Sequence, residues 1–172
     1  MPRLLVEATQ ISQVTNSSDS DVTLLTVTGS LVSGKRYAVF VSLEVFDNGS
    51  APVLTLIERA SATTMWVAYR GKTDSSDYWN QGGFAVWTAA STTSFNFDLK
   101  WRRAFAAGSN AARNVRLLLL ELDAADQYAE ASDLSTSSTS YVDAATLTFT
   151  PATTGDYIVL ASGYPYNSRV GA

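Results

Sequence analysis

The sequence contains an internal repeat with a period of about 120 residues. Segment 17–28 returns as segment 137–148, and after a shift of one residue segment 34–39 aligns with segment 155–159. The residues that recur 120 positions later are Ser17, Ser18, Ser20, Val22, Thr26 and Thr28. This period is too long for a solenoid repeat and matches the size of one β-sandwich domain. The repeat therefore predicts one complete module followed by the opening strands of a second.

Apolar and polar residues alternate with a period of two along most of the chain, which is typical of half-buried β-strands. Strands are expected at residues 37–45, 53–57, 64–69, 84–88, 95–101 and 114–122. Turns are expected at residues 29–30, 33–34, 47–50, 71–74, 82–83 and 108–110, because Gly, Asn, Asp and Ser favour turns. The segment Asp47-Asn48-Gly49-Ser50 carries the strongest hairpin signal. The pattern predicts an all-β fold, an antiparallel jelly-roll-like sandwich of two sheets.

The repeat and the alternation together divide the chain into three parts. We expect a β-sandwich module at residues 1–122, a linker at 123–133, and a second, incomplete module at 134–172. A short helical turn is the alternative for the linker. Residues 3–7 resemble residues 116–121, so a strand of this type is expected to precede each module. An open sandwich would expose its apolar faces, so we expect one of two arrangements. Either the natural chain continues beyond Ala172, which is the alternative we favour, or residues 134–172 complete their fold on another subunit.

The composition excludes several classes of function. The 172 residues include no cysteine and no histidine, which removes disulfides, thiolate chemistry, histidine acid–base catalysis and nearly all zinc or copper sites. The net charge is -4, whereas proteins that bind nucleic acid concentrate Lys and Arg. No apolar run approaches the length of a membrane span. We therefore expect no cofactor, no nucleic acid partner and no membrane insertion.

Four segments in the second half of the chain together carry a resemblance to known proteins. The residues that carry the resemblance are the leucine-rich strand 112–122, Tyr128-Ala129-Glu130, the Ser/Thr-rich strand from Ser137, and Thr150-Pro151-Ala152-Thr153-Thr154-Gly155-Asp156-Tyr157. This string is similar to the β-sandwich repeats in fibre and spike proteins of tailed bacteriophages and gene-transfer-agent-like particles. It covers residues 112–162 well and the first module only loosely.

The resemblance implies a structural virion protein, a component of a head or tail fibre or spike on the outside of a phage-like particle. Such a protein anchors the appendage and supports attachment to a host-surface glycan. The implied partners are further copies of the chain, as a trimer or pentamer, the capsid or tail proteins, and host-surface polysaccharide. No catalytic residue is implied, so no enzyme is expected. The alternatives are a free-standing carbohydrate-binding module, a bacterial surface adhesin, or an accessory domain of an enzyme.

Aromatic residues gather in and beside the segment 70–87, the most irregular by sequence. Aromatic rings stack on sugar C–H surfaces, while carboxylates and amides bind sugar hydroxyls. The candidate glycan-binding residues are Asp77, Tyr78, Trp79, Asn80 and Phe84. The alternative is that Trp87 fills the core while Tyr78 and Trp79 pack on a subunit or a sheet edge. Trp66 and Trp101 lie within alternating strands and are expected in the core or an interface.

Charged residues give weaker signals. Asp19 with Asp21, or Asp74 with Asp77, carry the oxygen ligands that calcium prefers, but solvated turn residues are the favoured interpretation. Glu44 and Asp98 lie on strand faces, and nothing in the sequence specifies that they meet as a glycosidase pair. No metal site is expected. Basic residues on strands are usually exposed; a patch toward an acidic partner is the alternative for Lys100, Arg102, Arg103, Arg113 and Arg116.

Overall fold

The computed structural model describes residues 3–48, 51–69, 78–104, 108–123 and 147–148. These residues form nine β-strands and no helix. The strands are β1 (Arg3–Gln10), β2 (Val14–Asn16), β3 (Val22–Leu31), β4 (Arg36–Asn48), β5 (Pro52–Glu58), β6 (Thr63–Tyr69), β7 (Tyr78–Thr88), β8 (Thr93–Arg103) and β9 (Ser109–Glu121). The six strands predicted from the alternation correspond to β4–β9, and the one at 114–122 extends one residue beyond the end of β9. β2 and β3 were not predicted.

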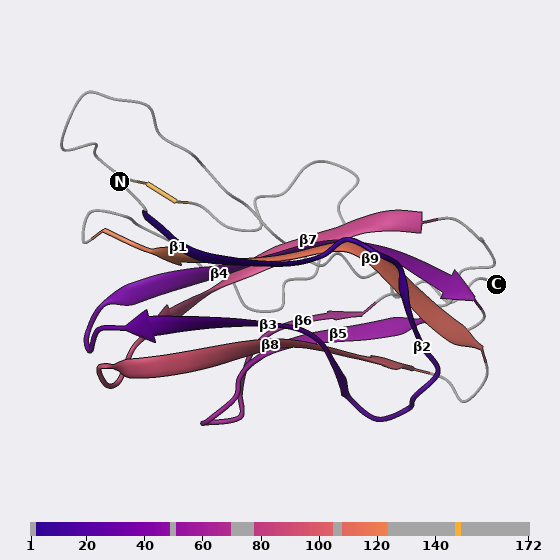
Figure 1. The fold of residues 1–172 in the computed structure, drawn as a ribbon, viewed down its shortest axis with the longest axis horizontal. Coiled ribbons are helices and arrows are strands. Elements are labelled where there is room, and N and C mark those ends of the chain that lie inside the picture. The colour runs from indigo at the N-terminus through magenta and orange to yellow at the C-terminus, as the bar shows by residue number, and fades with distance from the viewer. Residues whose placement is uncertain (1–2, 49–50, 70–77, 105–107, 124–146, 149–172) are drawn as a thin grey trace.

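The strands form two antiparallel sheets that lie face to face as two layers (Figure 1). Sheet A has the order β1-β9-β4-β7, and β2 also pairs with β9. Sheet B has the order β3-β8-β5-β6. From β3 onward the chain changes sheet at every connection except the one between β5 and β6. This is the strand order of a jelly roll, and it confirms the predicted fold class.

The hairpin predicted at residues 47–50 is wrong. β4 pairs with β7 and β9, whereas β5 pairs with β6 and β8, so the two strands that flank this segment belong to different sheets. Turn residues indicate that the chain reverses there. They do not specify whether the next strand pairs with the previous one or crosses to the opposite sheet.

Alternate side chains of both sheets meet between the layers and form the core. On β4 the inward residues are at most 3% exposed, and they are Tyr37, Val39, Val41, Leu43 and Val45. β8 contributes Phe95, Phe97, Leu99 and Trp101, and β9 contributes Val115, Leu117 and Leu119. The Tyr37 hydroxyl accepts a hydrogen bond from the Val32 amide at 2.8 Å, so its one polar atom is satisfied. Burial of this apolar surface is the main force that holds the sheets together.

Two glycine-containing segments predicted as turns lie inside strands instead. Gly29-Ser30 belongs to β3 and Gly82-Gly83 to β7. A Cβ on Gly29 would overlap the Leu119 side chain, and one on Gly83 would overlap the Trp66 indole. These glycines therefore let the two sheets approach each other closely. Gly34 and Gly108, by contrast, have φ angles of +77° and +86° and lie between strands, as predicted.

A polar cluster ties β3 and β8 of sheet B to the turn after β5. Arg59 donates from Nε and Nη2 to the two carboxylate oxygens of Asp98, at 2.8 and 2.6 Å, and Thr26 Oγ1 donates to the same carboxylate at 2.6 Å. The Arg59 hydrogen bonds lower the pKa of Asp98 below its ordinary value, against the opposing effect of burial. Asp98 is 2% exposed, so the cluster satisfies a charge that is costly to bury alone.

Glu58 at the end of β5 is buried in the same turn. Its carboxylate accepts hydrogen bonds from Ser61 Oγ at 2.7 Å and from the amides of Ala60 and Ser61 at 2.9 and 2.8 Å. Burial raises the pKa of Glu58, but these three hydrogen bonds together leave it below its ordinary value.

The expected linker and second module lie almost wholly outside the described residues; Asp123 and residues 147–148 are the parts described. Among the described residues, no helix is long and apolar enough to cross a membrane.

We predict that Gly83→Ala destabilises the protein by about 1–3 kcal/mol, because the added methyl group overpacks the contact with Trp66. Urea unfolding followed by tryptophan fluorescence measures the change. Thr88→Ala, at an exposed position of the same strand, is the control, and we expect it to change stability by less than about 0.5 kcal/mol. Equal stability of the two variants would contradict the close approach of β7 and β6.

We predict that Asp98→Asn lowers the free energy of unfolding by about 1–2 kcal/mol at pH 7. This value is at the low end for hydrogen bonds to a charged group, because the Arg59 side chain is half exposed. The folded pKa of Asp98 is depressed, so its contribution is present above the unfolded pKa of about 3.9 and is lost as the pH falls through the folded pKa. Unfolding curves at several pH values should therefore show the two proteins converging in acid. A difference in unfolding free energy that stays the same at every pH would contradict this account.

Candidate functional site

One row of side chains crosses the outer face of sheet A. The register pairs Thr15 of β2 with Ala111 of β9, Ala111 with Phe46 of β4, and Phe46 with Tyr78 of β7. Their neighbours Val45 and Ala112 are fully buried in the core. Because side chains alternate along a strand, the row faces away from the core. It combines two aromatic rings, a hydroxyl and one small residue from four strands that lie far apart in the sequence.

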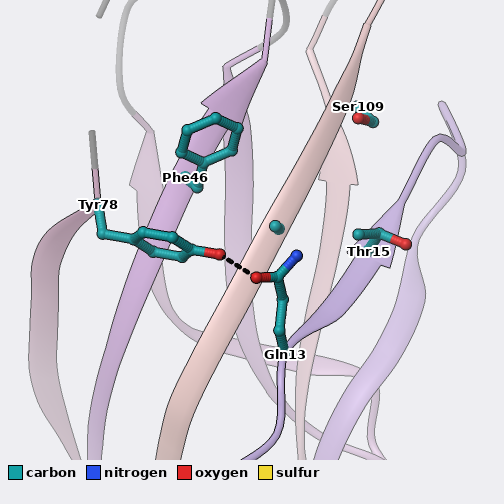
Figure 2. A pocket seen from close by; sticks show the side chains of 6 residues that line it. Gln13, Thr15, Phe46, Tyr78 and Ser109 are labelled. Carbon is teal, nitrogen blue, oxygen red and sulfur yellow. Dashed lines mark hydrogen bonds between the residues drawn. The ribbon is translucent and has the colours of Figure 1, made fainter. Parts of the chain in front are cut away.

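The row forms a shallow pocket with a volume of about 300 Å³. Figure 2 shows the Phe46 and Tyr78 rings on one side and Thr15 on the other, with Ser109 and Gln13 at the rim. Ala111 completes the lining. The hollow exists because Ala111 projects only a methyl group between the larger Phe46 and Thr15. The Tyr78 hydroxyl donates a hydrogen bond to Gln13 Oε1, which ties the ring to the segment before β2.

The Tyr78 ring is held by contacts with both Phe46 and Arg113. The centroids of Phe46 and Tyr78 are 5.3 Å apart with an interplanar angle of 39°. The Arg113 guanidinium lies over the Tyr78 ring, 3.9 Å from its centroid, in a cation–π contact. Arg113 Nε in turn donates to Glu44 Oε2 at 2.7 Å, and Asn114 Nδ2 donates to Glu44 Oε1 at 2.8 Å. The Tyr78 ring is therefore positioned before any ligand arrives.

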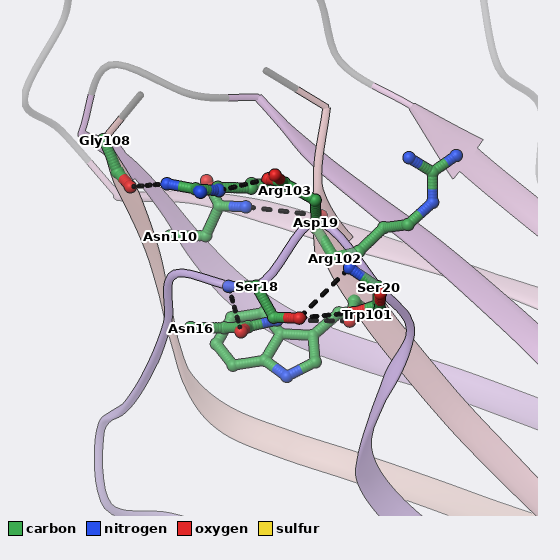
Figure 3. A network of polar contacts seen from close by, with 9 residues as sticks. All are labelled: Asn16, Ser18, Asp19, Ser20, Trp101, Arg102, Arg103, Gly108 and Asn110. Carbon is green, nitrogen blue, oxygen red and sulfur yellow. Dashed lines mark hydrogen bonds and ion pairs between the residues drawn. The ribbon is translucent and has the colours of Figure 1, made fainter. Parts of the chain in front are cut away.

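A second polar network secures the same end of the sandwich (Figure 3). Asn16 Nδ2 donates to the Trp101 carbonyl at 3.2 Å, and Asn16 Oδ1 accepts from the Ser18 amide at 2.8 Å. Arg103 pairs with Asp19 and donates to the Gly108 carbonyl at 3.1 Å. These contacts link the end of β2, next to Thr15, to the end of β8 and the start of β9. They fix β2 and the start of β9, two of the four strands of the pocket, against β8.

The five residues predicted for the site do not all come together. Tyr78 lines the pocket, and Asn80 is exposed opposite Glu44 on the outer face. Trp79 alternates to the inner face, where it packs against the core. Phe84 stacks on Phe40 at a centroid distance of 5.4 Å, further along the sheet. Asp77 lies outside the described residues.

The described part of segment 70–87 is a regular strand, β7, which corrects its description as irregular. Its glycine pair and mixed polarity obscured the alternation. The inward residue Trp87 makes edge contacts with Phe95 and Phe97, both at 6.3 Å. Trp101 is 2% exposed and Trp66 packs against the core, which confirms the core interpretation of both.

Sequence reasoning missed most of the pocket. Besides Tyr78 it is lined by Gln13, Thr15, Phe46, Ser109 and Ala111. Of these only Phe46 carries an aromatic signal, and it follows the alternating strand 37–45 by a single position. The other four are common small or polar residues, and they become a site only through the register of β2, β9 and β4.

The predicted carboxylate pairs that lie within the described residues do not form a catalytic or metal centre. Asp19 pairs with Arg103, and Asp21 with Arg102 at 3.4 Å. Glu44 and Asp98 lie on opposite sheets and both face away from the core, so they do not meet as a glycosidase pair. Asp74 and Asp77 fall outside the described residues. Within the described ranges no group of three or more acidic, histidine or cysteine residues is placed to hold a metal ion.

We predict that Asn16→Ala destabilises the pocket end, costing about 1–3 kcal/mol, because it removes two hydrogen bonds from a buried position. Amide hydrogen exchange should become faster in β2 than in β4. Ser20→Ala, at an exposed position, is the control and should leave both exchange and stability unchanged. Uniform acceleration in all strands would instead indicate a global loss of stability.

No protein-family model matches this sequence, and no curated protein matches it. Among solved structures, the chain is similar to the C-terminal domain of EclA, a sugar-binding protein (TM-score 0.41, 12% identity, 66% of this chain and 81% of that one). It is similar to a carbohydrate binding module from Cellvibrio mixtus lichenase 5A in complex with cellotriose (TM-score 0.39, 14% identity, 67% of this chain and 96% of that one). It is also similar to a structure of infectious bursal disease virus, Gx strain (TM-score 0.45, 11% identity, 72% of this chain and 32% of that one). The chain therefore spans about a third of that viral chain.

Proposed function

We propose that this protein is a non-catalytic glycan-binding module and that the Tyr78 pocket is its binding site. The observation that carries the proposal is the cross-strand row of Thr15, Ala111, Phe46 and Tyr78. It presents two aromatic rings beside a hollow that is rimmed by hydroxyl and amide groups. Sugar rings offer apolar C–H faces and many hydroxyls, so this combination is complementary to them.

Pre-organisation supports the proposal. The Tyr78 ring is fixed by Arg113 on its face, by Phe46 at its side and by Gln13 at its hydroxyl. A ring that is already ordered loses little conformational entropy on binding. The pocket is shallow and small, so it is suited to one or two sugar residues of a longer chain. Weak single-site binding of this kind becomes useful when several copies act together.

We propose an external appendage of a phage-like particle as the setting of this activity. The sequence resemblance of residues 112–162 to fibre and spike repeats supports it. In that setting the module is a structural component that anchors a fibre or spike to capsid or tail proteins, self-associates as a trimer or pentamer, and attaches to polysaccharide of the host surface. A free-standing carbohydrate-binding module or bacterial adhesin uses the same pocket without a particle.

We predict that the purified chain binds one or more immobilised oligosaccharides and that Tyr78→Ala weakens this binding at least tenfold, because an aromatic platform is lost. Ala111→Leu should weaken it comparably, since a larger side chain fills the hollow. A glycan array identifies the ligand, and titration calorimetry with that oligosaccharide measures the affinity of each variant.

Phe84→Ala is the matched control, because it removes an aromatic ring from the same face of sheet A, away from the pocket. Its affinity should stay within about twofold of the natural protein. Circular dichroism confirms that each variant is folded. Loss of binding with Phe84→Ala but not with Tyr78→Ala would indicate that the binding site lies at Phe84 and not at Tyr78. If the natural protein bound no glycan at all, the proposal would be refuted.

A further inference from the structure

We infer that Glu44 determines the specificity of the Tyr78 pocket: by neutralising Arg113 it makes the pocket select neutral sugars over acidic ones. This inference rests on the proposed function and adds the class of sugar. It assigns to Glu44 a positioning role, because it acts on the ligand through Arg113 and does not line the pocket.

The six residues that line the pocket are all uncharged, and they are Gln13, Thr15, Phe46, Tyr78, Ser109 and Ala111. Their side chains offer hydroxyl and amide groups that can donate to or accept from sugar hydroxyls. None of them offers a positive charge to a carboxylate. An acidic sugar bound here would lose part of its hydration without gaining an ionic partner from the lining, which is unfavourable.

The Arg113 guanidinium contacts the lining directly, 3.9 Å from the centroid of the Tyr78 ring. A carboxylate near the other side of the ring would be within the screening length of about 8 Å at physiological salt. Arg113 alone would therefore attract acidic sugars. Its charge is compensated by Glu44, whose carboxylate accepts from Arg113 Nε at 2.7 Å.

Glu44 is held in this role by a second donor. Asn114 Nδ2 donates to the other carboxylate oxygen at 2.8 Å, from a residue with a φ angle of +52°. The left-handed conformation of Asn114 accompanies the irregular register of β9 opposite β4, between Ser42 and Glu44. The hydrogen bonds from Asn114 and Arg113 lower the pKa of Glu44, so the carboxylate remains ionised at neutral pH.

The same compensation occurs at the neighbouring arginines of this end of the sandwich. Arg102 pairs with Asp21 and Arg103 with Asp19. Arg103 lies at the end of β8, where it donates to the Gly108 carbonyl next to Ser109, and Arg102 belongs to β8 in the opposite sheet. Arg113 contacts the lining itself, through the Tyr78 ring, and each of these three arginines has a carboxylate partner.

The test compares the natural protein with E44Q on three matched pairs of oligosaccharides, which are built from glucose or glucuronic acid, from galactose or galacturonic acid, and from mannose or mannuronic acid. Each pair differs at C6 alone. We expect the natural protein to bind one neutral member at least tenfold more tightly than its acidic counterpart. In E44Q the uncompensated Arg113 should reduce this ratio at least threefold.

The reduced ratio should be sensitive to salt. Raising NaCl from 50 to 500 mM should restore most of the preference of E44Q, because screening weakens the attraction of Arg113 for the carboxylate. A purely structural disturbance of the pocket would weaken the binding of both sugars alike, and the ratio of their affinities would not respond to salt in this way. Thermal unfolding checks that E44Q is folded.

Two further variants sharpen the result. The double variant E44Q/R113Q removes both charges and should recover a preference for the neutral sugar, which separates the charge effect from the loss of packing. Asp21→Asn removes the carboxylate partner of Arg102. Because Arg102 belongs to β8 of sheet B, whereas the pocket row lies on sheet A, this variant should leave the ratio unchanged.

The outcomes separate the two hypotheses. Tighter binding of an acidic sugar by the natural protein, or an unchanged ratio in E44Q, would overturn the inference and leave the proposed function in place. Failure of the natural protein to bind any of the six oligosaccharides, together with a negative glycan array, would overturn both.

Discussion

The close packing of two sheets through their alternate side chains is the constraint on which the structure depends. One face of every long strand is buried, and the contact is so close that Gly29 and Gly83 have no room for a methyl group opposite Leu119 and Trp66. Since the protein has no disulfide, this packing and its hydrogen bonds carry the stability. The outer faces are thereby left free to vary, and the candidate site lies on one of them.

Antiparallel pairing turns that outer face into a site. Four strands in register place residues from positions 15, 46, 78 and 111 in one row, and a small residue in the row makes a hollow. No backbone distortion is needed at the pocket itself. The irregularity lies next to it, where Asn114 and Glu44 hold Arg113 against the Tyr78 ring. The cross-strand row and the Arg113–Glu44 ion pair thus adjoin each other at the Tyr78 ring.

Polar groups at the ends of the sandwich complete the packing. Asn16 and Asn110 are buried where β2, β8 and β9 meet, and Glu58 and Asp98 are buried around the turn after β5. Asn16, Glu58 and Asp98 are satisfied by hydrogen bonds to backbone or neighbouring side chains, as buried polar groups usually are. Asn110 donates to the Arg102 carbonyl at 3.4 Å, while its Oδ1 has no hydrogen-bond partner among the described residues. These groups anchor the connections without enlarging the apolar core.

The sequence by itself determined the fold class and the positions of six of the nine described strands, because alternation with a period of two is a local property. It also restricted Trp66 and Trp101 to the core or an interface, and the structure places both against the core. Tertiary structure decided the rest. The segment 47–50 was predicted as a hairpin, yet it joins two sheets, and the turn at residues 59–62 was missed because it contains no Gly, Pro or Asn. Pairing between distant strands separated Tyr78 from Trp79 and Phe84 and brought it to Phe46, Ala111 and Thr15, and no local pattern encodes that register.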